Sequence, residues 1–299
     1  MTESYHRPVL ADEVLAAAAG ARRVVDATLG GGGHAALLAA KGVTLLGIDR
    51  DPAAIAAARQ RPELAGIAVV HSPYAEPAAL AAVRDFHPDF ILLDLGVSSH
   101  QLDAAERGFT FRPGAPLDMR MSGTGLTAGE WLDGADEADL KRVFAEYGDE
   151  RRAGALSREV VRRRERGSFK VSDDLVNVIR AVLGPRSGPG DFARLFQAVR
   201  IEINGELDGL QHALPAFRDA LVSGGRLAVI SYHSGEDRLV KHSFREWARS
   251  CICPPELPQC ICRGHALGRL VGRAVEAGAA EMAANPRARS ARLRVFQVA

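Results

Sequence analysis

Residues 24–34 read Val-Val-Asp-Ala-Thr-Leu-Gly-Gly-Gly-Gly-His, and this stretch decides the fold. An apolar, β-branched run ends at Asp26, and four glycines follow before an alanine-rich segment begins at His34. This order predicts a strand, a tight turn and the start of a helix. Glycine allows the backbone to turn sharply and lets a ligand approach without a Cβ in the way. The helix start would offer unpaired N–H groups to that ligand.

A second apolar run, over residues 43–48, ends at another acid, Asp49. An acid at the end of the second strand of such a sheet can accept hydrogen bonds from two ribose hydroxyls. The first fifty residues therefore predict a site for a cofactor that contains a nucleoside.

Strand-like and helix-like segments alternate along the first hundred residues. We predict strands over 24–28, 43–49, 67–71 and 90–95, and helices near 34–40, 52–60 and 76–86. After residue 200 the pattern returns, with helices over 206–221 and 237–250, a strand over 226–231 and a last, edge strand over 292–298. This alternation predicts an α/β fold, a mostly parallel sheet with helices on both faces.

Between residues 104 and 199 the sequence predicts helices and no strand. Ser172 and the two aspartates after it are typical of a helix start, and apolar residues at helical spacing continue to Leu183, before Gly184-Pro185. Further helices are expected over 138–147 and 157–166. We interpret residues 104–199 as an inserted all-helical domain, and residues 1–103 with 200–299 as the core domain.

Composition places the chain among ordinary globular proteins, with 47% hydrophobic and 25% charged residues. No apolar run approaches the ~20 residues of a membrane span, and the N-terminal residues lack the pattern of a secretory signal. We therefore expect a cytoplasmic protein without a membrane partner. The net charge of +1 is unevenly placed, because residues 141–170 hold ten Lys/Arg and five Asp/Glu. Such a basic segment indicates either a polyanionic partner or a solvated helix face.

The glycine turn alone does not identify the cofactor, because NAD, FAD, nucleotide and S-adenosylmethionine sites all use one. Ala35 stands where the dinucleotide pattern would prefer a third glycine. Asp26 would repel a pyrophosphate and attract the ammonium group of a methionine moiety, unless it only caps the turn. Tyr74, after the third strand, could stack on adenine or be a half-buried loop aromatic.

Many ordered segments carry a resemblance to a known family. They are His6-Arg7-Pro8-Val9-Leu10, residues 26–34, Gly47-Ile48-Asp49-Arg50-Asp51-Pro52, residues 92–99, Gln101-Leu102-Asp103, Glu106-Arg107-Gly108-Phe109, residues 116–121, residues 196–201, Ser231-Tyr232-His233-Ser234 with Glu236-Asp237-Arg238, and residues 285–290. Over nearly its whole length the chain resembles the bacterial 16S ribosomal RNA cytosine-N4 methyltransferases.

The resemblance implies a Rossmann-like class I methyltransferase with a helical insertion that recognises RNA, and S-adenosylmethionine as its cofactor. It implies the N4 amine of cytidine 1402 (rRNA numbering) in 16S ribosomal RNA of the small ribosomal subunit as substrate, with no DNA partner. By this resemblance the cofactor contacts fall on these residues: Gly32, Gly33, His34, Asp49, Tyr74, Asp94 and Gln101.

Four residues are candidates for the chemistry. Asp94, at the carboxyl end of a strand, could accept a hydrogen bond from the cytosine amine or serve the cofactor alone. His233 could orient the base or accept a proton, although a lone histidine is more often structural. Asp118 and Arg120 could close over the nucleotide or form an ion pair that fixes their loop. Arg162, Arg163 and Arg164 are expected to contact flanking phosphates.

The four cysteines form two C-x-C pairs, Cys251 with Cys253 and Cys260 with Cys262, and His265 lies nearby. They could bind zinc, although C-x-x-C is the usual spacing, or remain free or redox-active thiols. We assign no metal site on this pattern.

Two other function classes remain open. An NAD-dependent oxidoreductase would be stabilised by NADH and not by S-adenosylmethionine. A non-catalytic RNA-binding factor would bind RNA yet transfer no methyl group.

Overall fold

The computed structural model describes residues 8–98, 101–102, 104–254, 259 and 261–299, so that His6, Arg7 and Cys260 lie outside the described residues. The chain divides into two compact units, residues 1–96 with 208–299, and residues 97–207. The boundaries expected at residues 103 and 199 lie a few residues inside the second unit. No helix among the described residues is long and apolar enough to cross a membrane.

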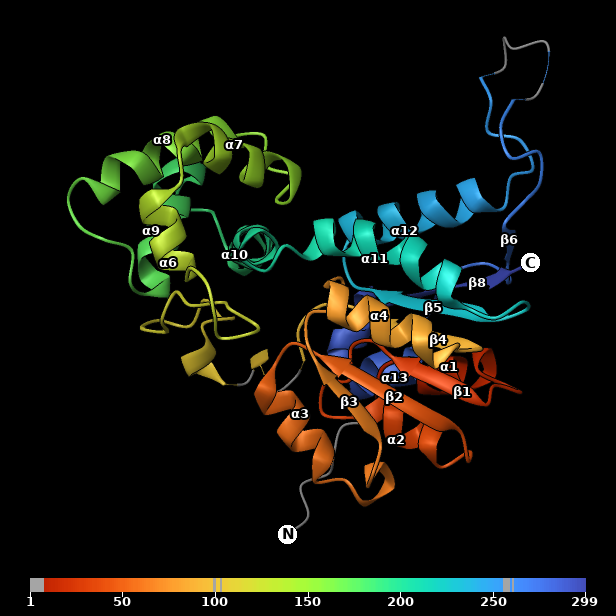
Figure 1. Cartoon of the computed structure of the whole chain (residues 1–299). Helices are drawn as coiled ribbons and strands as arrows, with labels where there is room; N and C mark the ends of the chain where they lie inside the picture. Colours follow the sequence, from red (N-terminus) through yellow and green to blue (C-terminus); the bar gives the residue numbers. More distant parts are fainter. Residues whose placement is uncertain (1–7, 99–100, 103, 255–258, 260) are drawn as a thin grey trace. The chain divides into compact units, whose positions relative to one another are not determined.

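The first unit is built on one sheet (Figure 1). Its strands are β1 (Arg23–Asp26), β2 (Thr44–Asp49), β3 (Ala68–His71), β4 (Phe90–Asp94), β5 (Arg226–Ser231), β6 (Gly268–Leu270), β7 (Val275–Glu276) and β8 (Arg292–Val298). Strands β3, β2, β1, β4 and β5 are neighbours in that order and run parallel. The strands expected from the sequence are confirmed, with ends shifted by two residues at most.

Strand β8 corrects one expectation. It was predicted to be an edge strand, but it pairs antiparallel with β5 on one side and with β6 and β7 on the other. The two short strands escaped prediction because β6 is three residues long and β7 is two. Such short segments show no periodicity of their own.

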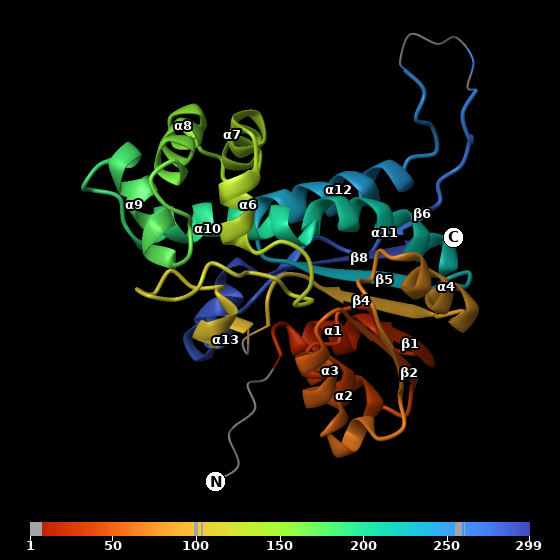
Figure 2. The same ribbon diagram turned by 60° about the vertical axis from the view of Figure 1, so that its left-hand side comes forward.

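Helices cover both faces of the sheet because neighbouring strand residues point to opposite sides. Val24 packs in one hydrophobic core, with residues of α1 (Ala11–Ala17), α2 (Gly33–Ala39) and α3 (Pro52–Arg59). Val25 packs in the other, with residues of α4 (Pro77–Phe86), α11 (Glu206–Ala220) and α12 (Ser234–Trp247). Figure 2 shows the latter three helices together on one side of the sheet. The remaining short elements of this unit are η1 (Pro62–Leu64), α13 (Ala279–Ala284) and η3 (Pro286–Ser290).

The order of the strands places a topological switch between β1 and β4. The chain runs outward from β1 through β2 to β3, then returns to the other side of β1 as β4. The connections that leave β1 and β4 therefore diverge at their carboxyl ends. Open α/β sheets bind ligands at such a point.

The second unit has its own core and, among the described residues 104–199, no strand. Its elements are η2 (Ala105–Arg107), α6 (Ala128–Gly134), α7 (Glu137–Glu146), α8 (Ala153–Arg164), α9 (Ser172–Leu183) and α10 (Pro189–Asn204). The expected all-helical character is confirmed. Helix α10 was not predicted, because it begins inside a stretch rich in glycine and proline, although Phe192, Leu195, Phe196 and Val199 follow helical spacing.

Candidate active site

The glycine loop between β1 and α2 is fixed by its neighbours. The N–H of Leu29 donates to the carbonyl of Ile48 at 2.8 Å, which ties the loop to the end of β2. Gly32 has a φ of +76°, and a Cβ there would lie 2.4 Å from Cδ1 of Leu64. Leu64 is only 3% exposed and cannot easily yield. Position 32 therefore requires glycine for both its backbone angle and the space around it.

Asp49 holds the loop from the other side. Its Oδ2 accepts from the N–H of Gly30 at 2.7 Å, and its Oδ1 accepts from the N–H of Asp51 at 2.8 Å. Burial raises the pKa of Asp49 above its ordinary value, although these N–H groups favour the charged form. A carboxylate offers about four lone pairs. The acid expected to bind ribose is thus in place, with acceptor capacity left after two backbone contacts.

Asp26 ends β1 and is almost fully buried, with 1% of its surface exposed. Burial raises its pKa to about 7, against the opposing effects of His34 and the Thr28 N–H, while the charges of Asp94 and Asp49 raise it further. Its Oδ1 accepts from the N–H of Thr28 at 3.2 Å. This contact is the turn-capping alternative left open by the sequence.

Asp94 lies at the end of β4 and is held by its neighbours. The hydroxyl of Tyr232 donates to Oδ1 at 2.8 Å, and the backbone N–H of Asp94 donates to Oγ1 of Thr28 at 2.6 Å. Nε2 of His34 lies 3.5 Å from Oδ2. Burial and the Asp94 charge raise the pKa of Tyr232 well above its ordinary value, so that the phenol stays a donor. Asp94, His34 and Tyr232 therefore lie together. The first two were predicted as site residues, and Tyr232 was not.

His34 is buried, and neither ring nitrogen has a hydrogen bond of normal geometry to any of the described residues. Burial lowers its pKa, but Asp94, Asp26 and Glu281 together outweigh that effect and raise it above the ordinary value. The family resemblance implied that His34 contacts the cofactor, and this stays a prediction. In the structure it also joins the Asp26 and Asp94 carboxylates electrostatically.

The sequence did not predict Tyr232 as a site residue, because its contact with Asp94 joins residues 138 positions apart. The available signal was its position directly after a strand, within the motif Ser231-Tyr232-His233-Ser234. His233 itself caps α12, where its Nδ1 accepts from the N–H of Gly235 at 3.2 Å. Its Nε2 lies 3.2 Å from Oε1 of Glu236. These contacts match the structural alternative for His233.

Tyr74 follows β3 and is partly buried. Its ring lies 6.3 Å from that of Phe217 on α11, at an interplanar angle of 50°. This is the half-buried loop aromatic left open by the sequence. The contact fixes the position of the ring, and stacking on adenine stays a prediction.

Gln101, Asp118 and Arg120 belong to the second unit. Gln101 is buried, and its Oε1 accepts from the N–H of Ser98 at 2.9 Å. Asp118 forms an ion pair with Arg120 at 2.7 Å. Although burial raises the pKa of Asp118, its hydrogen bonds with Arg120 lower it below the ordinary value. The ion-pair alternative for this loop is therefore present in the structure.

The arginines at the end of α8 have partners within the second unit. Arg162 and Arg163 form ion pairs with Glu159 at 2.6 and 2.7 Å, and Nη1 of Arg164 donates to the carbonyl of Ala135 at 2.5 Å. The same helix region carries the exposed arginines Arg151 and Arg158. Arg162 is exposed as well, whereas Arg163 and Arg164 are partly buried, and contact with phosphates stays a prediction.

Comparisons with known proteins agree over the whole length. The model described as the MraW methylase family matches residues 3–299. The chain is 56% identical to Ribosomal RNA small subunit methyltransferase H of Gemmatimonas aurantiaca over 304 residues, which covers 100% of this chain and 96% of that protein. Proteins of the same name from Heliobacterium modesticaldum and Heliobacterium mobile are each 44% identical. The match covers 98% of both chains for the first, and 99% of both for the second.

Proposed function

The chain belongs to the MraW methylase family, and we propose from this membership that it transfers a methyl group from S-adenosylmethionine to ribosomal RNA of the small subunit. The proposed acceptor is the N4 amine of cytidine 1402 (rRNA numbering) in 16S ribosomal RNA. The open, mostly parallel sheet with an all-helical insertion is that of a class I methyltransferase. A ribosomal substrate would meet the enzyme in the cytoplasm, where we propose that it acts.

The single observation that carries the proposal is the group of carboxylates at the switch point of the sheet. Asp26 lies beside Gly47 of β2 and Leu92 of β4 in register, and Asp49 and Asp94 each stand two residues further along those strands. Burial is the main cause of the raised pKa of Asp26, and the negative charges of Asp94 and Asp49 raise it further. Such a group favours a cationic nucleoside over a pyrophosphate.

The residues around the glycine loop fit S-adenosylmethionine. Asp49, at the end of β2, keeps acceptor capacity for a ribose diol. Bound there, the cofactor supplies an electrophilic methyl group on a positively charged sulfur. We propose that Gly32, Gly33, His34, Asp49 and Tyr74 hold it. Gln101 remains a proposed contact from the resemblance alone.

Asp94 is the residue that we propose acts on the amine. The N4 lone pair of cytosine is conjugated with the ring, and a carboxylate that accepts an N4–H would localise that pair and stabilise the developing positive charge. The Tyr232 hydroxyl holds Oδ1, and Oδ2 faces His34 at 3.5 Å. After transfer, Asp94 would take the extra proton from N4. Correct alignment of the reactants supplies on the order of 7–11 kcal/mol in such reactions.

The proposal gives structural roles to His233, Asp118 and Arg120. His233 orders the start of α12 and so supports the Tyr232 backbone, whose N–H donates to Oε2 of Glu236 at 2.8 Å. Asp118 and Arg120 fix their loop in the second unit. We propose the second unit as the RNA-recognition part because its surface carries the exposed arginines of α8 and the residues before it.

The test uses small subunits isolated from cells that lack this enzyme. The purified protein and labelled S-adenosylmethionine should convert one cytidine to N4-methylcytidine, located by mass spectrometry of ribosomal RNA fragments. Label on another base, or no label at all, would refute the proposed reaction. Thermal stabilisation by NADH and not by S-adenosylmethionine would favour the oxidoreductase, and RNA binding without transfer would favour the binding factor.

Variants test the part given to Asp94. Asp94→Asn should lower kcat by at least tenfold, because an amide accepts the N4–H more weakly and cannot take the proton. Tyr232→Phe should lower kcat less, and Asp219→Asn, which alters an exposed acid paired with Arg218, should retain full activity. If Asp94→Asn changes only the KM for S-adenosylmethionine, Asp94 serves the cofactor alone.

A further inference from the structure

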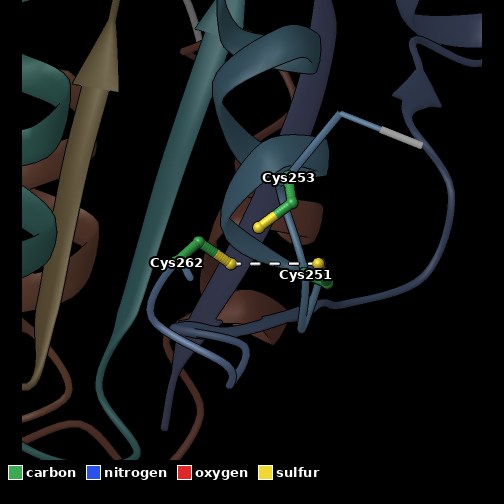
Figure 3. A group of neighbouring side chains, drawn as sticks. All are labelled: Cys251, Cys253 and Cys262. Carbon is green, nitrogen blue, oxygen red and sulfur yellow. Dashed lines mark hydrogen bonds between the residues drawn. The ribbon is translucent and has the colours of Figure 1, made fainter. Parts of the chain in front are cut away.

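A cluster of cysteines lies in the segment between α12 and β6, away from the carboxylates of the candidate active site. Cys251, Cys253 and Cys262 come from two C-x-C turns, and their sulfur atoms all lie within 4.8 Å of one another. Figure 3 shows the three side chains converging, with Sγ of Cys251 and Cys262 separated by 3.9 Å. The fold therefore brings Cys262 close to Cys251 and Cys253, although they precede it by eleven and nine positions in the sequence.

Backbone N–H groups point at two of these sulfurs in a reciprocal pattern. The N–H of Ile252, in the first turn, donates to Sγ of Cys262 at 3.4 Å. The N–H of Ile261, in the second turn, donates to Sγ of Cys253 at 3.4 Å. Each turn therefore donates to a sulfur of the other. Sulfur accepts hydrogen bonds from such N–H groups, and the metal-binding form of cysteine is the thiolate.

We propose that Cys251, Cys253 and Cys262 bind a structural zinc ion. Zinc is tetrahedral with Zn–S distances of about 2.3 Å, so two sulfurs of one site lie about 3.8 Å apart. The 3.9 Å between Cys251 and Cys262 matches that separation. A disulfide would need about 2.05 Å, which is much shorter than this separation. Sulfur ligands also exclude calcium and magnesium, which bind oxygen.

The zinc would hold a loop whose two ends already meet. The N–H of Leu267 donates to the carbonyl of Trp247 at 2.8 Å, where the segment leaves α12 and returns toward β6. Just after the end of α12, the carbonyl of Arg249 accepts from Nη2 of Arg263 at 3.0 Å. The described residues between these contacts, 250–254, 259 and 261–262, are largely exposed and supply little hydrophobic core. A metal cross-link is the means by which such segments keep a fold.

The test measures metal in the full-length protein, purified without chelator from cells grown with zinc. Elemental analysis after gel filtration should give about one zinc per chain, and Cys251→Ser and Cys262→Ser should each lower this at least fivefold. His265→Ala is the matched control, because His265 lies next to the cluster in sequence but outside the converging group, and it should retain the metal. Zinc below ~0.2 equivalents in the wild type, with none gained on adding Zn²⁺, would overturn the proposal.

A second measurement does not depend on folding of the variants. Wild-type protein loaded with Co²⁺ should show thiolate-to-cobalt charge-transfer absorption and the intense visible bands of a tetrahedral site, both abolished by Zn²⁺. Absence of any charge-transfer band, or a Cys251–Cys262 disulfide found by mass spectrometry of freshly purified protein, would refute the site.

Discussion

Gly32→Ala is the sharpest test of how the glycine loop is held. The new Cβ would lie 2.4 Å from Cδ1 of Leu64, about 1.1–1.6 Å closer than an ordinary carbon–carbon contact. Leu64 is buried, so its side chain or the loop must move, and overpacking of this kind costs about 1–3 kcal/mol. The φ of +76° adds about 1–2 kcal/mol for any residue with a Cβ. We expect Gly32→Ala to lower the free energy of unfolding by about 2–5 kcal/mol.

Gly42→Ala is the matched control for the backbone term. Gly42 has a φ of +77°, but a Cβ there would meet nothing within 4 Å. It should therefore cost only the strain of about 1–2 kcal/mol. In a Leu64→Ala background, where the shortest contact is removed, Gly32→Ala should cost less than in the wild type, but still more than Gly42→Ala because Cδ of Arg61 at 3.2 Å and Cβ of Ala58 at 3.3 Å remain close. The coupling between positions 32 and 64 should be about 1–3 kcal/mol.

Urea unfolding followed by tryptophan fluorescence measures these free energies. Trp247 lies in the first unit and Trp131 in the second, so a Trp131→Phe background lets the signal report on the unit that contains both glycines. Gly32→Ala should also weaken S-adenosylmethionine binding by calorimetry, whereas Gly42→Ala should not. Equal losses of stability for the two alanine variants would refute the packing argument.

Three further predictions concern other parts of the chain. The pKa of Asp26 is about 7 in the folded protein, against an ordinary value of 3.8. Between these pH values the folded protein holds a proton that the unfolded chain has lost. The contribution of Asp26 to the free energy of unfolding should therefore fall by on the order of 1 kcal/mol per pH unit as the pH rises from about 4 to about 7. In urea titrations, Asp26→Asn should gain stability relative to wild type up to about pH 7, and a constant difference would contradict this. Asn204 accepts from the N–H of Met121 and donates to the carbonyl of Met119, so Asn204→Ala should cost about 2–4 kcal/mol in Trp131-monitored unfolding, while the exposed Asn177→Ala should cost almost nothing. Replacing exposed Arg151 and Arg158 together by alanine should weaken binding to 16S ribosomal RNA and reduce the slope of log K against log[salt] by roughly 1–2; an unchanged slope in filter binding would remove these arginines from the RNA surface.

Local pattern was sufficient for most of the fold. The strand–glycine–helix order at Asp26, the acid at Asp49 and the strand Arg226–Ser231 were all readable, because propensity, turn chemistry and alternation depend on residues within a few positions of one another. Family motifs then pointed to S-adenosylmethionine and ribosomal RNA. Most residues of the candidate site were named in this way, but Tyr232 and the contacts between the residues were not.

Contacts between distant residues required the three-dimensional structure. Tyr232 and Asp94 are 138 positions apart, and no periodicity relates them. The inner position of β8 likewise depends on pairing with β5, β6 and β7, which its own sequence does not encode. The C-x-C spacing of the cysteines is unusual for a zinc site, whereas the convergence of the Cys251, Cys253 and Cys262 sulfur atoms from two turns favours one. Short-range propensities determine which elements form, but burial, charge coupling and ligand geometry depend on which elements meet, and only the folded chain decides that.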